Sequence, residues 1–159
     1  MTGGLYAATL ATALGCGLVA GVFFAFSTFV MPALKRLPPA HGIAAMQSIN
    51  KLAVTPAFMT ALFGTAVACL GLVAWAAISS GERPAALVLA GGMLYIVGTI
   101  GVTIACNVPL NEGLATLRPQ SADAAGRWDG YVSKWTAWNH VRAVAALAAA
   151  ATLISALHV

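Results

Sequence analysis

Residues 5–34 read LYAATLATALGCGLVAGVFFAFSTFVMPAL and contain no charged side chain. About 20 apolar residues in a helix are enough to cross the hydrocarbon core of a bilayer, where no water can satisfy the polar groups of the backbone. The run is far longer than the roughly 7–15 apolar residues of a signal peptide, and no Lys or Arg precedes it. Residues 5–34 are therefore predicted to form a transmembrane helix that stays attached to the protein.

Three further stretches are long and apolar enough to cross a bilayer, at residues 56–78, 84–106 and 135–157. They are rich in Ala and Leu and do not alternate between apolar and polar residues, which disfavours a closed β-barrel. Only residues 79–83 separate the second stretch from the third, and such a tight turn makes the two helices antiparallel neighbours. The predicted fold is an all-α bundle of four transmembrane helices that forms one domain over residues 1–159.

The composition is that of a membrane protein, because 60% of the residues are hydrophobic and only 8% are charged, whereas soluble domains carry roughly 25% charged residues. The formal net charge of +4 comes from scattered Lys and Arg side chains. No basic run could follow a phosphate backbone, so nucleic acid is not an expected partner. Cys16, Cys69 and Cys106 lie inside apolar runs without the spacing of metal ligands and are interpreted as packing residues.

Two longer connectors, residues 35–55 and 107–134, join the first span to the second and the third span to the fourth. A proline marks the junction between span and connector in both cases, Pro32 near the end of the first span and Pro109 near the start of the second connector. One interpretation is that the chain is a duplication of one helix-connector-helix unit. Apolar residues recur at helical spacing in the first connector, at Ile43, Met46, Ile49 and Leu52. This pattern predicts a short amphipathic helix at the membrane interface. In the second connector, Ser121 or Asp123 could cap an amphipathic helix that runs straight into the fourth span.

The basic residues gather on one side of the predicted bundle. The two connectors contain Lys35, Arg36, Lys51, Arg118, Arg127 and Lys134, whereas the short turn on the other side contains Arg83 alone. Membrane proteins keep loops that are rich in Lys and Arg in the cytoplasm. Both amphipathic connectors are therefore expected on the cytoplasmic side of the membrane, and both termini are expected outside.

Small residues recur four positions apart in the first two spans, as Gly17 with Gly21 and as Gly64 with Ala68, and Gly98 and Gly101 lie in the third span. Such spacing lets helix backbones approach each other closely in lipid. Two interpretations stay open. The small residues either pack the helices of one four-helix bundle, or they form a seam through which the chain assembles into a homo-oligomer.

Polar and aromatic residues follow one another along the start of the fourth span at spacings of 3, 4, 4 and 3, namely Trp128, Tyr131, Trp135, Asn139 and Arg142. These spacings place all of them on one face of a continuous helix. Arg142 lies about two turns, on the order of 12 Å, beyond Lys134 into the bilayer. A charge at that depth normally faces the bundle interior or a wet cavity and marks function, although an arginine can also extend back to the headgroups.

Asn107 and Asn111 stand four residues apart and bracket Pro109, whose ring loosens the helix at this level. Their amides are expected to point toward the depth of Asn139 and Arg142. Hydrogen bonding between helices is the alternative role for these two asparagines. A metal site is not predicted, because only His41, His140 and Glu112 could be assembled for one and they lack the paired ligand spacing of a bundle site.

Three segments carry a resemblance to a known family: FVMPAL at 29–34, NVPLN at 107–111 and WTAWNHVR at 135–142. Together with Trp128 and Tyr131 they resemble the anthrone oxygenase-like family of small four-helix membrane proteins. The resemblance extends over nearly the whole chain and includes the segment 46–50. Most members of that family are bacterial, which implies an integral protein of the bacterial inner membrane. The named activity belongs to fungal polyketide pathways, where an anthrone is oxidised by O₂ to an anthraquinone without a bound cofactor.

The resemblance implies roles for particular residues, with neither a cofactor nor a metal. Such a reaction needs a base for the acidic CH of the substrate and donors for the developing oxyanion. The expected catalytic residues are His140 as the base and, as donors, Arg142, Asn139, Asn107 and Asn111. The residues expected to bind the flat substrate are Trp128, Tyr131, Trp135, Trp138 and Asn50.

Two functions from different classes remain in view. The first is a cofactor-independent membrane oxygenase that oxidises an anthrone-like or other planar phenolic compound, a small hydrophobic aromatic ligand, with O₂. The second is a non-catalytic membrane protein that binds a lipid, a quinone or a partner helix at the same polar face. A channel or transporter is disfavoured, because the polar residues reach only about halfway across the bilayer.

Overall fold

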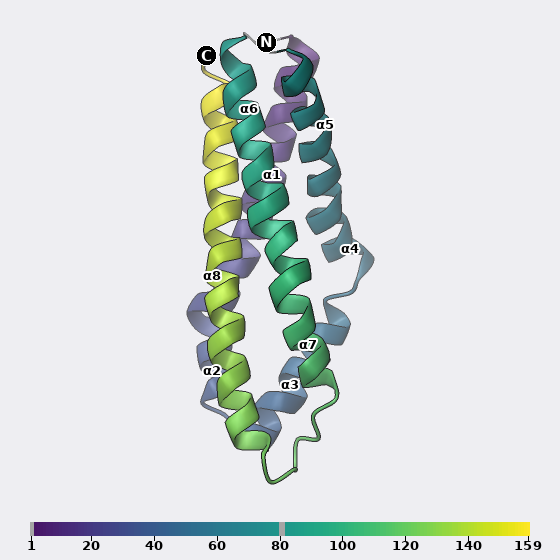
Figure 1. Cartoon of the computed structure of the whole chain (residues 1–159), viewed down its shortest axis with the longest axis vertical. Helices are drawn as coiled ribbons and strands as arrows, with labels where there is room; N and C mark the ends of the chain where they lie inside the picture. The colour runs from purple at the N-terminus through teal and green to yellow at the C-terminus, as the bar shows by residue number, and fades with distance from the viewer. Residues whose placement is uncertain (1, 80–81) are drawn as a thin grey trace.

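The structure, a computed structural model, describes residues 2–79 and 82–159. Within these residues, four helices are long and apolar enough to cross a membrane: Gly3–Lys35, Pro56–Ile78, Pro84–Ala115 and Ala124–Ala156. They run along the long axis of the molecule, and the described part of the chain contains no strand (Figure 1). The predicted all-α fold is confirmed, and the protein is a multi-pass membrane protein. Ser80 and Gly81, in the predicted turn between the second and third spans, lie outside the described residues, as does Met1.

Three of these four spans consist of α-helical and π-helical segments in series. The first span contains α1 (Gly3–Ala25), the π-helix η1 (Phe26–Val30) and α2 (Met31–Lys35). The second contains α4 (Pro56–Met59), η2 (Thr60–Gly64) and α5 (Thr65–Ile78). The third contains α6 (Arg83–Met93), η3 (Leu94–Gly101), η4 (Thr103–Asn107) and α7 (Val108–Ala115). The fourth is the continuous helix α8 (Ala124–Ala156), which has 33 residues.

Two of the π-helical segments stand next to a proline. η1 directly precedes α2, which contains Pro32, and η4 directly precedes α7, which contains Pro109. A proline lacks the N–H group and its ring clashes with the carbonyl four residues earlier, so a regular α-helix cannot pass through it undisturbed. A wider π-helical turn accommodates the disturbance without ending the helix. The third span therefore continues to Ala115 instead of ending at the predicted Cys106.

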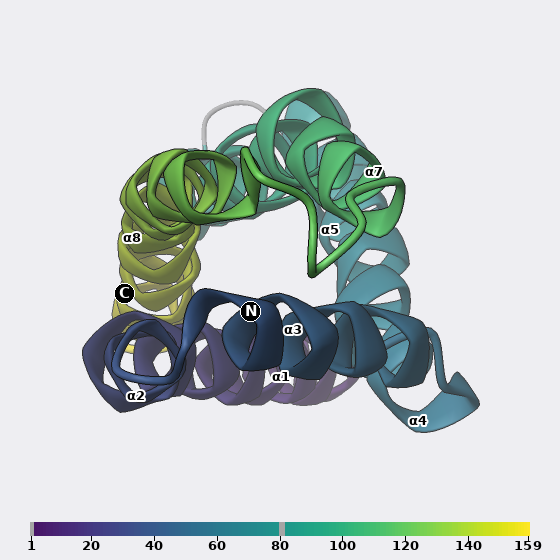
Figure 2. The same ribbon diagram turned by 90° about the horizontal axis from the view of Figure 1, so that it is seen from below.

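The long helix α8 holds the bundle together. It packs against α1 on one side and against α6 and η3 on the other, while α5 packs mainly against α6 (Figures 1 and 2). Between Arg142 and the C-terminus, the interior face of α8 consists of small and aliphatic side chains, namely Ala145, Ala146, Ala149, Ala150 and Leu153. Small side chains let the neighbouring backbones come close, and close packing is what holds helices together in lipid.

The first connector forms the predicted helix, α3 (Pro39–Leu52), which lies across the end of the bundle opposite to the two termini (Figures 1 and 2). We call this end the connector end. The apolar face of α3 is buried at Ile43 and Met46, as its helical spacing predicts. A second hydrophobic cluster at the connector end, separate from the main core, contains these two side chains.

The second connector follows the predicted plan, a helix that begins near Ser121 or Asp123 and runs straight into the fourth span. Residues 116–123 form no helix, and α8 begins at Ala124, with Asp123 at its N-cap position, and continues without a break through the fourth span. Arg118 precedes Pro119, and a residue before a proline is disfavoured in a helix, so α7 cannot continue through this segment. Asp123 stands at the predicted cap position, but its side chain makes no capping hydrogen bond.

The small residues fall into two groups. A Cβ atom added at Gly98 would lie 2.5 Å from Cβ of Ala145 on α8, so this glycine permits the close contact between the third and fourth spans. A Cβ atom added at Gly17 or Gly21 would meet no described atom within 4 Å. The interpretation as packing residues of a single bundle is therefore confirmed for Gly98 and is wrong for Gly17 and Gly21.

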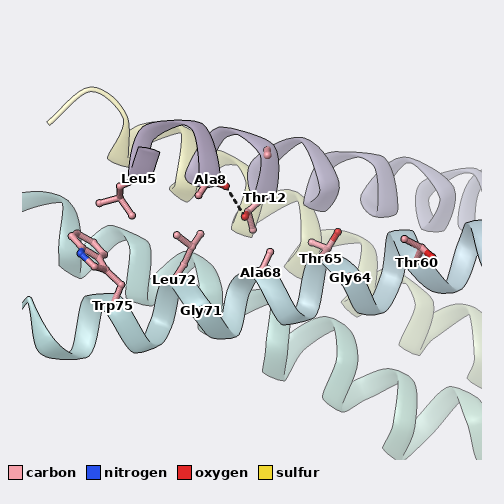
Figure 3. A pocket seen from close by; sticks show the side chains of 11 residues that line it. Leu5, Ala8, Thr12, Thr60, Gly64, Thr65, Ala68, Gly71, Leu72 and Trp75 are labelled. Carbon is pink, nitrogen blue, oxygen red and sulfur yellow. Dashed lines mark hydrogen bonds between the residues drawn. The ribbon is translucent and has the colours of Figure 1, made fainter. Parts of the chain in front are cut away.

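Gly64 and Ala68 line an apolar groove of about 740 Å³ between α1 and the η2–α5 segment (Figure 3). Trp75 lies at the end of this groove near the termini. The polar side chains in the groove are threonines, and Thr12 bonds with its hydroxyl to the carbonyl of Ala8 at 2.8 Å. No charged side chain lines the groove within the described residues, so it offers a surface for apolar chains and no group for chemistry.

Candidate functional site

A second cavity lies nearer the connector end, where the polar residues of α8 face the other spans. Its volume is about 490 Å³, within the range of roughly 300–1,000 Å³ that small-molecule sites have. Most of its lining is aromatic or aliphatic: Val22, Phe23, Phe26, Met46, Ile49, Phe58, Met59 and Leu62. Its polar lining consists of Asn50, Thr103, Asn111, Trp135 and Arg142 among the described residues. An apolar cavity with a few convergent polar groups is typical of a ligand site.

Arg142 is the charged residue of this cavity, and its side chain is only 5% exposed. Helical side chains lean toward the N-terminus of their helix, so the guanidinium reaches back by one turn. Its Nη2 donates to Oδ1 of Asn139 at 2.6 Å, and its Nη1 donates to Oγ1 of Thr103 at 3.2 Å. The guanidinium carbon lies 4.1 Å from the ring centroid of Phe23 and 5.3 Å from that of Trp135. Arg142 therefore faces the bundle interior.

The charge of Arg142 has no acidic partner among the described residues. Within them, the ion pair formed is Asp123 with Arg127 at the start of α8, and Glu112 is exposed. The Nε atom of Arg142 is buried and makes no hydrogen bond to the described residues. A buried charge without a counter-charge is costly, and the two aromatic rings offset only part of that cost. The arrangement is one in which an anion could supply the counter-charge.

Asn139 fixes the position of Arg142. Its Nδ2 donates to the carbonyl of Phe23 and to Oγ of Ser27, both at 2.7 Å, while its Oδ1 accepts from Arg142. The side chain is fully buried and joins α8 to the first span. Both ends of the amide are bonded and Asn139 does not line the cavity, so its observed role is to hold the guanidinium of Arg142 in place.

Asn111 and Asn107 link the third span to α8. Oδ1 of Asn111 accepts from the Tyr131 hydroxyl at 2.9 Å and from Nε1 of Trp135 at 2.8 Å. Nδ2 of Asn107 donates to the backbone carbonyl of Trp135 at 3.2 Å, and its buried Oδ1 has no partner among the described residues. Both asparagines therefore make the hydrogen bonds between helices that were the alternative to a catalytic role, although Asn111 also lines the cavity.

The structure does not bring every expected site residue to the cavity. His140 is exposed on the outer side of α8, because it is one residue past Asn139 and therefore points roughly 100° away from that buried side chain. Trp138 lies at the flank of the inward face and is 42% exposed. Trp128 is 2% exposed and stacks on Tyr131 with ring centroids 5.6 Å apart. Both side chains belong to the connector-end cluster and not to the cavity lining. The assignment of His140 as a base inside the site is therefore corrected.

Two residues that contact Arg142 were absent from the sequence-based site, Phe23 and Thr103. A signal for Thr103 exists in the sequence, because Thr99, Thr103, Asn107 and Asn111 follow one another at intervals of four and form a polar stripe along the third span. Thr99 also bonds to the fourth span, with Oγ1 donating to the carbonyl of Arg142 at 3.4 Å. Phe23 lies in an apolar run, where no periodic pattern of polar residues distinguishes it from its neighbours.

In the part of the chain that the structure describes, no three His, Cys, Asp or Glu side chains come together in a way that could hold a metal ion. The chemistry that the arrangement does support is the binding of an anion with an aromatic body. Phe23, Phe26, Phe58 and Trp135 offer ring faces and edges. Arg142 and the amide of Asn50 offer donors.

The sequence model of the anthrone oxygenase family matches residues 53–152 of the chain. The chain belongs to the anthrone oxygenase family. No curated protein and no solved structure matches it. The anthrone oxygenase match includes Asn107, Asn111 and Arg142, whereas Phe23 and Asn50 precede it. The resemblance in segments 29–34 and 46–50 likewise falls outside the matched region.

Proposed function

We propose that this member of the anthrone oxygenase family is a membrane oxygenase that binds a planar phenolic or anthrone-type compound as its anion beside Arg142. The observation that carries the proposal is the buried guanidinium of Arg142, which has no acidic partner among the described residues and lines an apolar, aromatic cavity. A ligand anion would supply the missing counter-charge. The rings of Phe23, Phe26 and Trp135 suit a flat aromatic body.

The ionised state of the substrate is central to the reaction that we propose. An anthrone that loses a proton from its acidic CH₂ group becomes an electron-rich anion, which reacts directly with O₂. Overall, the CH₂ group is oxidised to a carbonyl while O₂ is reduced, with one oxygen atom going into the quinone and the other into water. Arg142 stabilises the anion and so lowers the pKa of the bound substrate. Neither an imidazole nor a carboxylate lines the cavity among the described residues, so the proton leaves to water at the membrane edge, which the exposed lining residues Leu52 and Val54 reach.

Non-catalytic binding of a quinone or another anionic aromatic ligand is the second candidate function. It is favoured by one observation, the absence of a side-chain base from the described lining of the cavity. The two candidates differ in a measurable way, because only the oxygenase consumes O₂ when an anthrone is present. A lipid or a partner helix is a weaker candidate ligand, because the charged group that lines this cavity is the cation Arg142.

Oxygen uptake by the purified protein tests the oxygenase directly. With an anthrone as substrate, the wild-type protein is expected to consume one O₂ for each quinone formed. His140→Gln should keep this turnover because His140 is exposed outside the cavity, whereas Trp135→Leu should lose most of it because Trp135 lines the cavity beside Arg142. Loss of turnover in His140→Gln, with Trp135→Leu unaffected, would return the base to His140 and overturn this site.

We propose further that the connector end faces the cytoplasm, on the asymmetry of Lys and Arg between the two ends. Reporter fusions at Gly81 and at Ser121 are then expected on opposite sides of the membrane, with Ser121 inside. Finding both reporters on one side would remove the four-span topology, and finding Ser121 outside would reverse the orientation.

A further inference from the structure

The cavity beside Arg142 opens sideways between the second and third spans. Near the termini these spans are in contact, because α5 packs against α6 and η3. Toward the connector end, neither α4 nor η2 packs extensively against η4 or α7. The cavity lining includes well-exposed side chains on both spans that border this gap, Phe63 at 43% and Val108 at 38%, and on the connector that leads into the second span, Leu52 at 68% and Val54 at 70%. We call these four residues the lateral opening. All of them are apolar.

The position of the lateral opening along the bundle places it in the half of the bilayer at the connector end. At about 1.5 Å per residue, Phe63 lies about 22 Å along its span from Ile78, and Val108 lies about 36 Å along its span from Pro84. The hydrocarbon core is about 30 Å thick. Phe63 therefore lies at a depth within the hydrocarbon and Val108 near its edge, where exposed apolar side chains favour contact with lipid over contact with water. Leu52 and Val54 continue the opening onto the connector.

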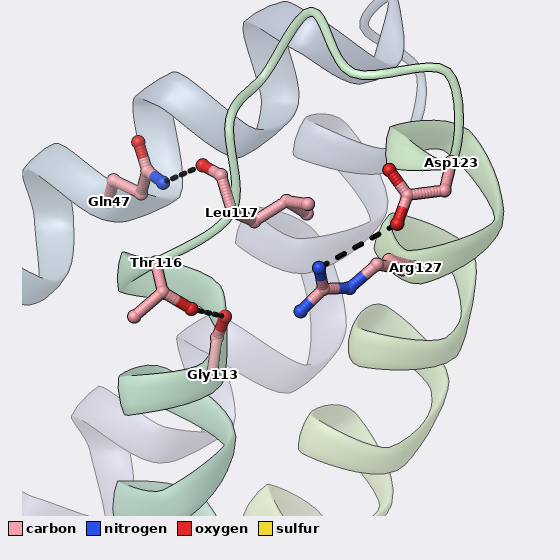
Figure 4. Close-up of polar contacts among 6 residues, drawn as sticks. All are labelled: Gln47, Gly113, Thr116, Leu117, Asp123 and Arg127. Atoms are coloured by element: carbon pink, nitrogen blue, oxygen red, sulfur yellow. Dashed lines mark hydrogen bonds and ion pairs between the residues drawn. The ribbon is translucent and has the colours of Figure 1, made fainter.

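A tightly packed layer covers part of the cavity on the side of the connector end. The cluster below it is tightly packed, with Ile43 at 0%, Met46 at 1% and Leu114 at 2% exposed. Gln47 on α3 ties this layer to the end of the third span, because its Nε2 donates to the carbonyls of Leu114 at 2.8 Å and Leu117 at 2.9 Å (Figure 4 shows the second bond). A ligand that entered from water through this layer would have to break these contacts.

We propose that the ligand reaches Arg142 from the bilayer through the lateral opening, and that the substrates are lipid-dissolved phenols with an apolar part that stays in that opening. This inference rests on the proposed function, since it concerns the same cavity. The ring oxygen lies at Arg142 in the depth of the cavity, and the apolar part of the molecule extends past Phe63 and Val108 toward lipid. A polar, water-soluble phenol is a poor ligand, because the opening offers it no hydrogen-bond partner.

A kinetic experiment on protein reconstituted in phospholipid vesicles tests the route. The probe is a hydroxyanthraquinone with a dodecyl chain, and its binding is followed by quenching of tryptophan fluorescence. The double variant Val54→Phe with Val108→Phe narrows the lateral opening and is expected to slow binding several-fold. The matched control, Val67→Phe with Val97→Phe, carries the same change at two exposed valines of the second and third spans that do not line the cavity, and it should bind at the wild-type rate.

Two more variants separate the outcomes. Phe63→Ala widens the opening and should speed binding, which keeps the route testable even if the narrowed variant does not fold. Gln47→Ala loosens the connector end and should leave the rate unchanged. Faster binding in Gln47→Ala, together with unchanged rates in the narrowed and widened variants, would overturn the lateral route. If Arg142→Gln binds the probe as tightly as the wild type, the proposed function itself fails, whatever the rates are.

Discussion

Arg142→Gln is expected to lose affinity for an ionised planar phenol while its fold remains intact. Removing one partner of a buried charged contact costs about 2–5 kcal/mol, or about thirtyfold to a few thousandfold in affinity. The ligand-free variant should be at least as stable as the wild type, because it no longer buries an unpaired cation. Ligand-induced shifts in the thermal unfolding of the detergent-solubilised protein measure both effects in one experiment, and anthrone turnover measures the consequence.

Two companion variants make the Arg142 result decisive. Arg142→Lys keeps the charge but loses the planar fork of donors, so binding should weaken and not vanish. Arg142→Ala should not bind the ionised ligand at all. If Arg142 were only a structural link to Thr103 and Asn139, Arg142→Ala would unfold the bundle and no variant would respond to ligand. A stable Arg142→Ala protein with unchanged turnover would contradict the assignment outright.

Gly98→Val is expected to cause the largest loss of stability of any single change considered. A Cβ atom at residue 98 would lie 2.5 Å from Cβ of Ala145, so the third and fourth spans must move apart. Overpacking of this kind costs about 1–3 kcal/mol or more. Gly101→Val is the matched control, because its Cβ would meet only the carbonyl of Ile96, at 3.7 Å. Thermal unfolding followed by circular dichroism should show a clear loss for the first variant and little change for the second.

A rescue experiment confirms the cause of the Gly98 effect. Gly98→Ala should also destabilise the bundle, and Ala145→Gly should restore much of the loss in the double variant by removing the methyl group that clashes. Equal stability of Gly98→Val and Gly101→Val would show that the third and fourth spans do not pack as described. Failure of the rescue would place the strain somewhere other than Ala145.

Much of the fold could be predicted from the sequence, because hydropathy over about 20 residues is a strong signal in a membrane protein. The second span was placed at its observed bounds, Pro56–Ile78. The third span is longer at the connector end than the sequence predicts, because the polar residues after Cys106 belong to the same long helix. The helix that runs from the second connector straight into the fourth span is found as predicted. A π-helical turn before Pro109 keeps the third span helical. No pattern in the sequence predicts this turn.

The half of the site on α8 could also be predicted, because helical periodicity places Trp135, Asn139 and Arg142 on one face, and all three are buried there. The same periodicity places His140 outside that face, yet its chemistry made it an attractive base. Position along the helix should have outweighed residue type. Periodicity is therefore a better guide to a site in a long helix than the list of groups that could react.

The part of the cavity outside α8 could not be predicted from the sequence. Phe23, Phe58 and Leu62 line it, but in an apolar span a side chain that faces a cavity has the same character as one that faces lipid. In a soluble protein the contrast with water marks the buried face of a helix. Lipid around the helices removes that contrast. The direction in which a side chain points can then be predicted only for polar residues such as Thr103.

The pKa of a bound phenol tests the central claim most directly, because an indicator such as a hydroxyanthraquinone changes colour when it ionises. The absorbance of the probe is titrated with pH in the presence of saturating wild-type protein and, in parallel, of Arg142→Gln. A cationic site should lower the pKa of the bound phenol by about one unit or more, equivalent to about 1.4 kcal/mol, and the variant should not. A bound pKa that equals or exceeds that of the free probe in the wild-type protein would contradict the claim that Arg142 binds the ligand as an anion.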